Sequence, residues 1–260
     1  MSWISLINGF QETHEKRSDE FEIPDVDTIL AGDIKDPRKS WRLNDDEFIA
    51  GKLSDFSANW AIVAEGDSRS EKFLHIIRNG LDIFEFLKSD QVLSDAPMQN
   101  SKSARNNADF VRETLAKWVD QRVVEIVDYY SDTLINGLIV AMDNGKPSRL
   151  CLHTLHVNNA LRDCPFSLPT VYDLAIMTEP GYGVTTVDIK SGFLHIPLQS
   201  KSKRLLGMQF PDEHGNIITH RSRVMMWGMK IASYIFQEIQ AIPVRFLQRK
   251  GAQITLMTQV

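Results

Sequence analysis

Two hairpin signals in the second half of the sequence constrain the fold more than any other feature. The first is Asp143-Asn144-Gly145, which separates an apolar run at 138–142 from a second run at 149–155. Asn and Gly tolerate the positive φ angles of a two-residue hairpin turn, so this pattern predicts a pair of antiparallel strands. A similar turn at Gly215-Asn216 predicts a second pair, with its strands at 205–210 and 217–224.

Apolar residues recur at helical spacing in much of the remaining chain. The longest such pattern runs from Phe110 to Val127 and predicts a helix over 108–128. The polar segment 89–107 has the composition of a linker. Helices that lead into a mixture of hairpins and helices predict an α+β fold and not a doubly wound parallel sheet. Further helices are expected at 53–60, 73–81, 171–177 and 231–247, the last in spite of Pro243, and further strands at 184–188 and 254–257.

Composition excludes several classes of protein. With 260 residues, of which 43% are hydrophobic and 24% charged, the chain is not disordered, collagen-like or a disulfide-rich scaffold. Cys151 and Cys164 offer no disulfide framework and no metal-ligand spacing, and two thiols suit a reducing compartment. The N-terminus lacks the pattern of a secretory signal, and no run approaches the roughly 18 apolar residues of a membrane span. We expect a cytoplasmic or nuclear protein without a membrane partner.

Charge is distributed unevenly along the chain. Residues 1–130 hold 16 basic and 25 acidic residues, whereas residues 131–260 hold 13 and 9. The first 50 residues are dense in charge, poor in apolar residues and without sustained periodicity, which predicts an acidic, poorly ordered arm. The mildly basic second half is suited to a phosphate backbone, although the same balance is common on ordinary surfaces.

One carboxylate stands where chemistry is expected. Asp188 ends the β-branched run Val184 to Val187 and precedes a short helical pattern from Lys190. A carboxylate at the end of a buried strand is a natural ligand for Mg²⁺, since hard cations take oxygen ligands. Asp188 is also suited to capping the helix that follows, and spacing alone favours this second interpretation.

Several motifs, in their order along the chain, resemble those of retroelement reverse transcriptases. Val187 to Leu198 reads VDIKSGFLHIPL and resembles the first catalytic motif of these enzymes. Leu138 to Asn158 resembles the fingers hairpin, Pro165 to Pro169 the short proline motif that follows it, and Arg223 to Gln237 the segment carrying the Pro-Phe-Gly and Ala-Pro pairs. Residues 51–60 and 76–80 resemble the segment ahead of the polymerase core in tyrosine-recombinase (DIRS-like) retrotransposons. The resemblance, to DIRS-like and gypsy-like enzymes, covers about 51–90 and 109–260.

The resemblance implies an RNA-directed DNA polymerase with two Mg²⁺ ions, an RNA or DNA template–primer and deoxynucleotide substrates. Asp188 would be a ligand of the catalytic metals, and Ile189 would contribute its backbone carbonyl. Phe193 would exclude a 2′-hydroxyl, although a core position is an equally good interpretation of this side chain. Other nucleotide and template–primer residues would be Arg149, Lys146, Gln237, Gly228 and Trp227. For Arg149, which would clamp the incoming triphosphate with its bidentate charge, a solvated hairpin position is the alternative.

The sequence also departs from the family pattern. Met142 and Asp143 replace lysines before the hairpin turn, so only Lys146 supplies that charge; His153 and Leu155 replace an Asp and an Arg, and Trp227 and Ser233 a Phe and a Pro. In the same register Gln259 and Val260 stand at the catalytic Asp-Asp pair, where the sequence ends. Transfer through two metal ions requires several carboxylates. We therefore expect a truncated enzyme that does not polymerise DNA as this chain.

The resulting prediction is a partial right-hand polymerase, with fingers and part of the palm, after a helical and acidic N-terminal extension. The expected parts are the arm 1–50, the helical extension and linker 51–107, and the incomplete fingers and palm 108–260. Two alternatives stay open: a non-catalytic remnant that binds nucleic acid or protein, and an unrelated α+β domain in which Asp188 is a cap. The histidines lack the ligand spacing of a zinc site.

Overall fold

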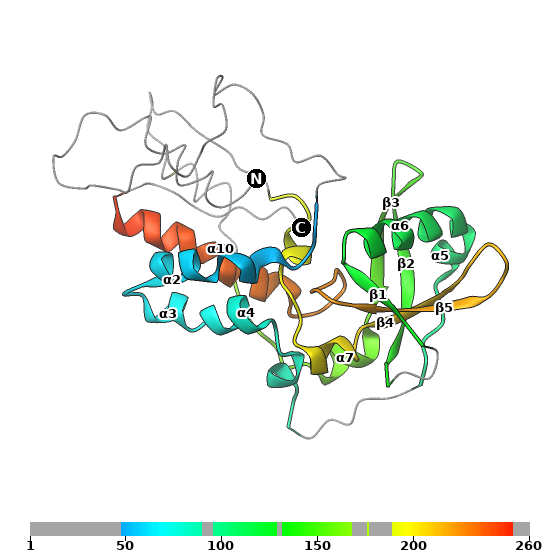
Figure 1. Ribbon diagram of the computed structural model, residues 1–260, viewed down its shortest axis with the longest axis horizontal. Coiled ribbons are helices and arrows are strands. Elements are labelled where there is room, and N and C mark those ends of the chain that lie inside the picture. Colours follow the sequence, from blue (N-terminus) through cyan, green and yellow to red (C-terminus); the bar gives the residue numbers. More distant parts are fainter. Residues whose placement is uncertain (1–47, 90–95, 129–131, 168–175, 177–188, 252–260) are drawn as a thin grey trace. The chain divides into compact units, whose positions relative to one another are not determined.

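The computed structural model describes residues 48–89, 96–128, 132–167, 176 and 189–251 (Figure 1). The chain divides into two compact units, one formed by residues 1–48 and 181–190 and the other by residues 49–180 and 191–260. Nearly all described residues belong to the second unit. The predicted arm 1–50 lies outside the described residues except for its last three positions, as do the elements expected at 184–188 and 254–257 and, apart from Ile176, at 171–177.

A five-stranded open sheet in the order β1-β5-β4-β2-β3 forms one part of this second unit. Neighbouring strands are antiparallel except β2 and β4, which are parallel over a short stretch. The predicted α+β class is confirmed at this level. The strands are β1 (Val124–Val127), β2 (Ile135–Asp143), β3 (Lys146–His153), β4 (Gly207–Pro211) and β5 (Ile217–Ser222).

Both predicted hairpins are confirmed. Strands β2 and β3 meet at a turn in which Asn144 has φ 49° and Gly145 has φ 77°, the left-handed values that this turn requires. Strands β4 and β5 are joined through a turn in which Gly215 has φ 85°. Residues that accept positive φ in the two turns therefore predicted both strand pairs correctly.

The segment predicted as a linker is in part built into the sheet. Strand β2 pairs with β4 only at Ile135 and Asn136. Beyond these two residues, the same edge of β2 forms hydrogen bonds with residues 98–103 instead. The Met98 amide donates to the Ile135 carbonyl (3.0 Å), and the Leu138 amide donates to Oδ1 of Asn100 (2.9 Å). Polar side chains here satisfy backbone groups of β2, and helix α5 (Lys102–Asn106) follows directly. The linker interpretation of this segment is therefore corrected.

Helix α6 (Ala108–Asp120) lies across the sheet and contacts both edge strands, β1 and β3. Its buried residues are Val111, Leu115 and Trp118. The prediction of one helix as far as residue 128 is wrong, because the chain turns at Arg122 (φ 60°) and residues 124–127 pair with β5 instead. Three of these residues, Val124, Ile126 and Val127, are β-branched and suit a strand as well as helical spacing. Pairing with β5 selects the strand.

Short helices before residue 90 pack against one long helix from the end of the described chain, α10 (Ala232–Arg249). Helices α2 and α3 contact α10 directly, and Figure 1 shows them beside it. The predicted helices at 53–60, 73–81 and 231–247 are confirmed, the last with Pro243 inside it. The short elements are η3 (Lys52–Phe56), α2 (Ser57–Ala64), α3 (Ser68–Glu71), α4 (Leu74–Asn79) and η4 (Ile83–Phe86).

The N-terminal helices also bond to the segment after residue 190. The Leu81 amide donates to the Pro197 carbonyl (2.7 Å), and the Gln199 amide donates to the Leu81 carbonyl (3.0 Å). Gly80, at φ 85°, allows this approach, since a Cβ there would lie 2.9 Å from the Leu198 carbonyl carbon. The remaining helices are α7 (Leu155–Ala160), η5 (Gly192–His195) and α9 (Ser200–Lys203). In the described ranges, no helix combines the length and the apolarity needed to cross a membrane.

Candidate functional site

Four aromatic side chains from separate parts of the chain meet near the start of α10, and we call them the aromatic cluster. Trp118 of α6 is stacked on Trp227, with ring centroids 6.5 Å apart. Phe193 of η5 lies 6.2 Å from Trp227 and 5.2 Å from Phe236, edge-on to the latter. Trp118 and Phe236 are buried, whereas Phe193 and Trp227 are half-buried. Two rings of the cluster are therefore covered, and the other two keep part of their surface exposed.

A glycine permits this arrangement. The chain enters η5 through Ser191, which has φ 54°, and continues with Gly192. A Cβ on Gly192 would collide with the ring of Phe236, so only glycine lets η5 approach α10 this closely. The Gly-Phe pair that the sequence places after Asp188 thus brings Phe193 into contact with α10.

The loop at residues 227–230 is held against β3 and α7. The Leu152 amide donates to the Trp227 carbonyl (3.2 Å), and the hydroxyl of the buried Thr154 donates to the Gly228 carbonyl (2.8 Å). Asn158 contributes at both ends of its amide, donating to the Gly228 carbonyl (2.7 Å) and accepting from the amide of Lys230 (2.8 Å). Gly228 itself is exposed, so the loop is a fixed and accessible piece of backbone.

The geometry of Gly228 excludes other residues. Its φ is 102°, and a Cβ would collide with the Leu152 carbonyl oxygen. Sequence reasoning selected Gly228 and Trp227 but gave no role to Thr154, Asn158 or Trp118. The alternation of residues along β3 and the helical spacing of Trp118 on α6 predict that a side chain is buried. They do not predict which distant loop it contacts.

Gln237 follows Phe236 on α10 and is half-buried. Its Nε2 donates to the Ser167 carbonyl (2.6 Å), while Oε1 is buried and has no hydrogen-bond partner among the described residues. A buried amide oxygen without a donor is costly. Gln237 thus holds the segment after α7 next to the aromatic cluster and retains an unused acceptor.

The predicted cations of the hairpin lie apart from the aromatic cluster. Arg149 is exposed on β3 opposite Ala141, and Lys146 is exposed next to the turn, opposite Asp143. Arg149 is three residues from Leu152, or about 10 Å along a strand. Both cations are therefore available to solvent on the hairpin.

The Arg149 guanidinium also affects the neighbouring Cys151. Burial raises the pKa of the Cys151 thiol, and the nearby guanidinium opposes that shift.

The predicted metal site is not described by the structure. Asp188, Gln259 and Val260 lie outside the described residues, and Ile189 is half-buried. Within the described ranges, no group of three or more His, Cys, Asp and Glu side chains is placed to hold a metal ion. These residues therefore supply no magnesium site on which a mechanism could be built, and the metal role of Asp188 stays a prediction.

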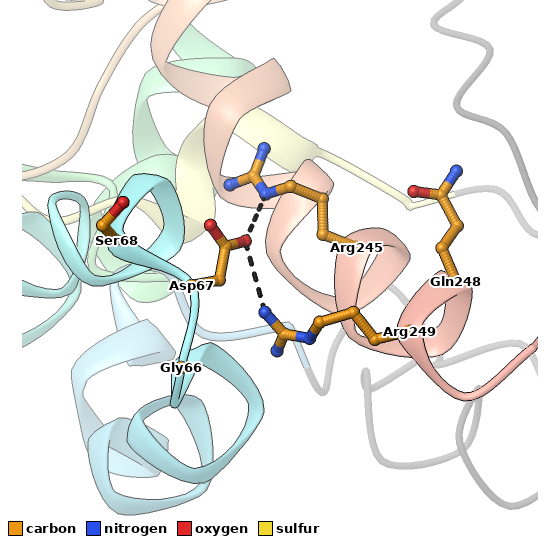
Figure 2. Close-up of a pocket in the computed structure, with 6 residues that line it drawn as sticks. All are labelled: Gly66, Asp67, Ser68, Arg245, Gln248 and Arg249. Carbon is orange, nitrogen blue, oxygen red and sulfur yellow. Dashed lines mark hydrogen bonds and ion pairs between the residues drawn. The ribbon is translucent and has the colours of Figure 1, made fainter.

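A second group of charged residues joins α10 to α3, beginning at Glu238, two positions after Phe236, and continuing toward the end of α10. Glu238 is buried and pairs with Arg69, and Arg245 donates through Nε to Oδ2 of Asp67 (2.8 Å). Burial alone would raise the pKa of Asp67, but the Ser70 hydrogen bond and the Arg245 charge hold it below the usual value. Figure 2 shows Arg245 and Arg249 directed toward Asp67 beside a pocket. Sequence reasoning did not select these residues.

Comparison with known proteins does not assign this chain to a family. No family model matches the sequence, and no curated protein matches it at a significant level.

Proposed function

We propose that residues 108–260, which follow the helical extension 51–107, are the fingers and partial palm of a retrotransposon reverse transcriptase, of the DIRS-like or gypsy-like kind. The single observation that carries this proposal is the meeting of Phe193, Trp227 and Gly228 near the start of α10, with Gln237 next to them. The sequence motifs assign these residues to one nucleotide and template–primer site. Aromatic side chains also gather in ordinary cores, so the binding assay described below separates this proposal from an unrelated α+β domain.

In this proposal residues 108–260 bind a template–primer of RNA or DNA. The exposed backbone at Gly228 approaches the nucleic acid, and Trp227 and Phe193 offer aromatic faces for a base or sugar. Arg149 and Lys146 extend the contact to phosphates along the hairpin, since arginine matches phosphate oxygens with two parallel hydrogen bonds. Asp188 is the proposed Mg²⁺ ligand of the RNA-directed DNA polymerase class.

Binding without polymerisation is the activity proposed for this chain. Gln259 and Val260 occupy the positions of the Asp-Asp pair in the register of the motifs, and neither side chain offers an anionic oxygen to a metal. A primer-extension assay with Mg²⁺ is therefore expected to give no product. Extension by the unaltered chain would contradict this part of the proposal.

The binding test uses the full chain and a labelled RNA–DNA template–primer, with fluorescence anisotropy measured over a range of salt concentrations. Phosphate contacts make log Kd depend linearly on log salt. Arg149→Gln is expected to weaken binding and to reduce the slope by about one contact. Arg78→Gln, the same change at an exposed arginine on α4, is the matched control and should leave both values unchanged.

Two results would overturn the proposal. One is the absence of saturable binding at low salt. The other is an equal effect of Arg149→Gln and Arg78→Gln, which would indicate attraction by overall charge and no defined site. A chain that binds the template–primer with a normal salt slope but fails to extend it agrees with a polymerase-derived binding module.

A further inference from the structure

The pocket in Figure 2 lies between the turn that connects α2 to α3 and the last turns of α10. Its volume is about 530 Å³. The residues that line it are Gly66, Asp67, Ser68, Arg245, Gln248 and Arg249. Arg245 and Arg249 follow Phe236 by nine and thirteen positions, which is about 14 to 20 Å of helix, so this pocket is separate from the aromatic cluster.

Arg245 has more hydrogen-bond donors than acceptors around it. Its Nε donates to Oδ2 of Asp67 (2.8 Å) and to the Ser70 hydroxyl (3.1 Å). Its Nη1 is 3.7 Å from Oε2 of Glu238, which is an ion pair beyond hydrogen-bond length. Its Nη2 is buried and finds no acceptor among the described residues. The guanidinium charge is thus only partly compensated.

Arg249 is in a similar position and is more accessible, with 37% of its side chain exposed. Its Nη1 is 3.6 Å from Oδ2 of Asp67, again longer than a hydrogen bond. Its Nη2 donates to the Val63 carbonyl (3.1 Å), which holds the side chain at the pocket. Arg249 therefore contributes a positioned charge with unused donors.

Asp67 forms a hydrogen bond with only one of the two arginines. Its Oδ1 accepts from the Arg69 amide (3.1 Å), and its Oδ2 already accepts from the Ser70 hydroxyl (2.6 Å) and from Arg245. Glu238 pairs with Arg69 and adds only the long contact to Arg245. Two guanidinium groups thus share one carboxylate at the pocket lining, and Glu71 adds a carboxylate that accepts from the Gly66 amide (3.2 Å). Nη2 of Arg245 is buried, so the accessible N–H groups at the pocket are those of Arg249.

We propose that this pocket binds a phosphate group between Arg245 and Arg249, with Ser68 at its edge. A tetrahedral oxyanion supplies acceptors to the exposed N–H groups of Arg249 and negative charge beside both arginines, and the planar guanidinium fork matches phosphate oxygens. The pocket is larger than a single ion, so the phosphate belongs either to free inorganic phosphate with water or to a phosphodiester. This inference does not depend on the proposed polymerase ancestry.

The test is isothermal titration calorimetry of the full chain with two probes, inorganic phosphate and a dinucleotide phosphodiester that has no terminal phosphate. Binding of at least one probe with a Kd near the millimolar range is expected. Arg249→Gln should weaken binding about tenfold, because one charge-assisted pair is lost. Arg249→Lys should weaken it less, since the charge remains and the fork does not. Arg78→Gln on α4 should have no effect.

Asp67→Asn separates a ligand site from a purely structural ion pair. The substituted amide would retain an oxygen for the Arg69 backbone N–H but remove the charge that competes with the anion. Phosphate affinity should therefore rise severalfold, even if the folded state becomes less stable. A merely structural role of the carboxylate predicts no such gain. Circular dichroism of each variant checks that the fold is retained.

Each outcome decides the proposal. It is overturned if neither probe binds saturably, if Arg249→Gln binds as well as the unaltered chain, or if Arg78→Gln weakens binding equally. It is also overturned if Asp67→Asn lowers affinity in a folded protein. Binding of phosphate alone identifies the free anion as the ligand, and binding of the dinucleotide identifies a nucleic-acid backbone.

Discussion

Asn158 is the residue on which the loop 227–230 depends most directly. Both ends of its amide are used, toward the Gly228 carbonyl and the Lys230 amide. Asn158→Ala removes both bonds, and we expect the free energy of unfolding in urea to fall by about 1–3 kcal/mol. Asn159→Ala, at the neighbouring position, is the control and should change it by less than about 0.5 kcal/mol. Equal losses would contradict the role of Asn158.

His220 makes stability depend on pH. It is buried on β5, its Nδ1 has no partner in the described part of the chain, and burial lowers its pKa despite a hydrogen bond with the Ile218 backbone. The unfolded chain, with a histidine pKa of about 6.5, then binds more protons than the folded one. The stability that neutral His220 contributes is fully present above a pH of about 6.5. It is lost as the pH falls from there toward the lowered pKa of His220 in the folded chain.

The measurement is urea unfolding at several pH values between about 5 and 7.5, which bracket the usual histidine pKa. We expect His220→Gln to flatten the loss of stability at low pH, because glutamine does not titrate. His214→Gln, at an exposed turn position, should leave the slope as it is. If the free energy of unfolding of His220→Gln depends on pH as steeply as that of the unaltered chain, other groups cause the dependence.

At the scale of elements, alanine substitution at two glycines with positive φ compares the cost of backbone strain alone with the cost of strain plus a steric collision. Gly215→Ala, in the β4–β5 turn, meets nothing within 4 Å, so we expect only the left-handed cost of about 1–2 kcal/mol. Gly228→Ala meets the Leu152 carbonyl as well and should cost roughly 3 kcal/mol or more, with displacement of the loop. Urea unfolding of the two variants compares the costs, and similar losses would contradict the close packing of the loop on β3.

Prediction from the sequence succeeded for elements whose signals are local. The two turns at Asn144-Gly145 and Gly215-Asn216 and the apolar spacing of α10 depend on neighbouring residues, and the structure agrees. The strand at Val124–Val127 was missed because the same residues satisfy a helical pattern. The segment 98–103 was missed because its polar side chains bond to a strand nearly forty positions away.

At the scale of the whole molecule, the helices before residue 90 stabilise the rest of the unit. The Gly51 amide donates to the Leu194 carbonyl (2.9 Å), and the Ile83 amide donates to the Ser202 hydroxyl (2.8 Å). Removal of residues 1–88 would uncover the buried residues Leu194, Ile196 and Leu198. We expect such a chain to lose cooperative thermal unfolding and to bind a hydrophobic dye.

A chain that lacks only residues 1–47 is the comparison, because it separates the contribution of the helices from that of the preceding residues. Near-ultraviolet circular dichroism measures side-chain packing in each chain. Retention of a native spectrum and of a sharp unfolding transition after removal of residues 1–88 would show that the helices are dispensable for the fold.

The sequence by itself determined the class of the fold, both hairpins and the longer helices α2, α6 and α10. The residues that it selects for nucleotide and template contact stay a prediction. These follow from turn conformation, side-chain periodicity and motif order, which are properties of short segments. Only the tertiary structure decided that Trp118 stacks on Trp227, that Asn158 holds Gly228, and that Asp67 is shared by two arginines of α10. The physical reason is that these contacts join residues far apart in the chain, whose approach depends on the packing of the whole unit.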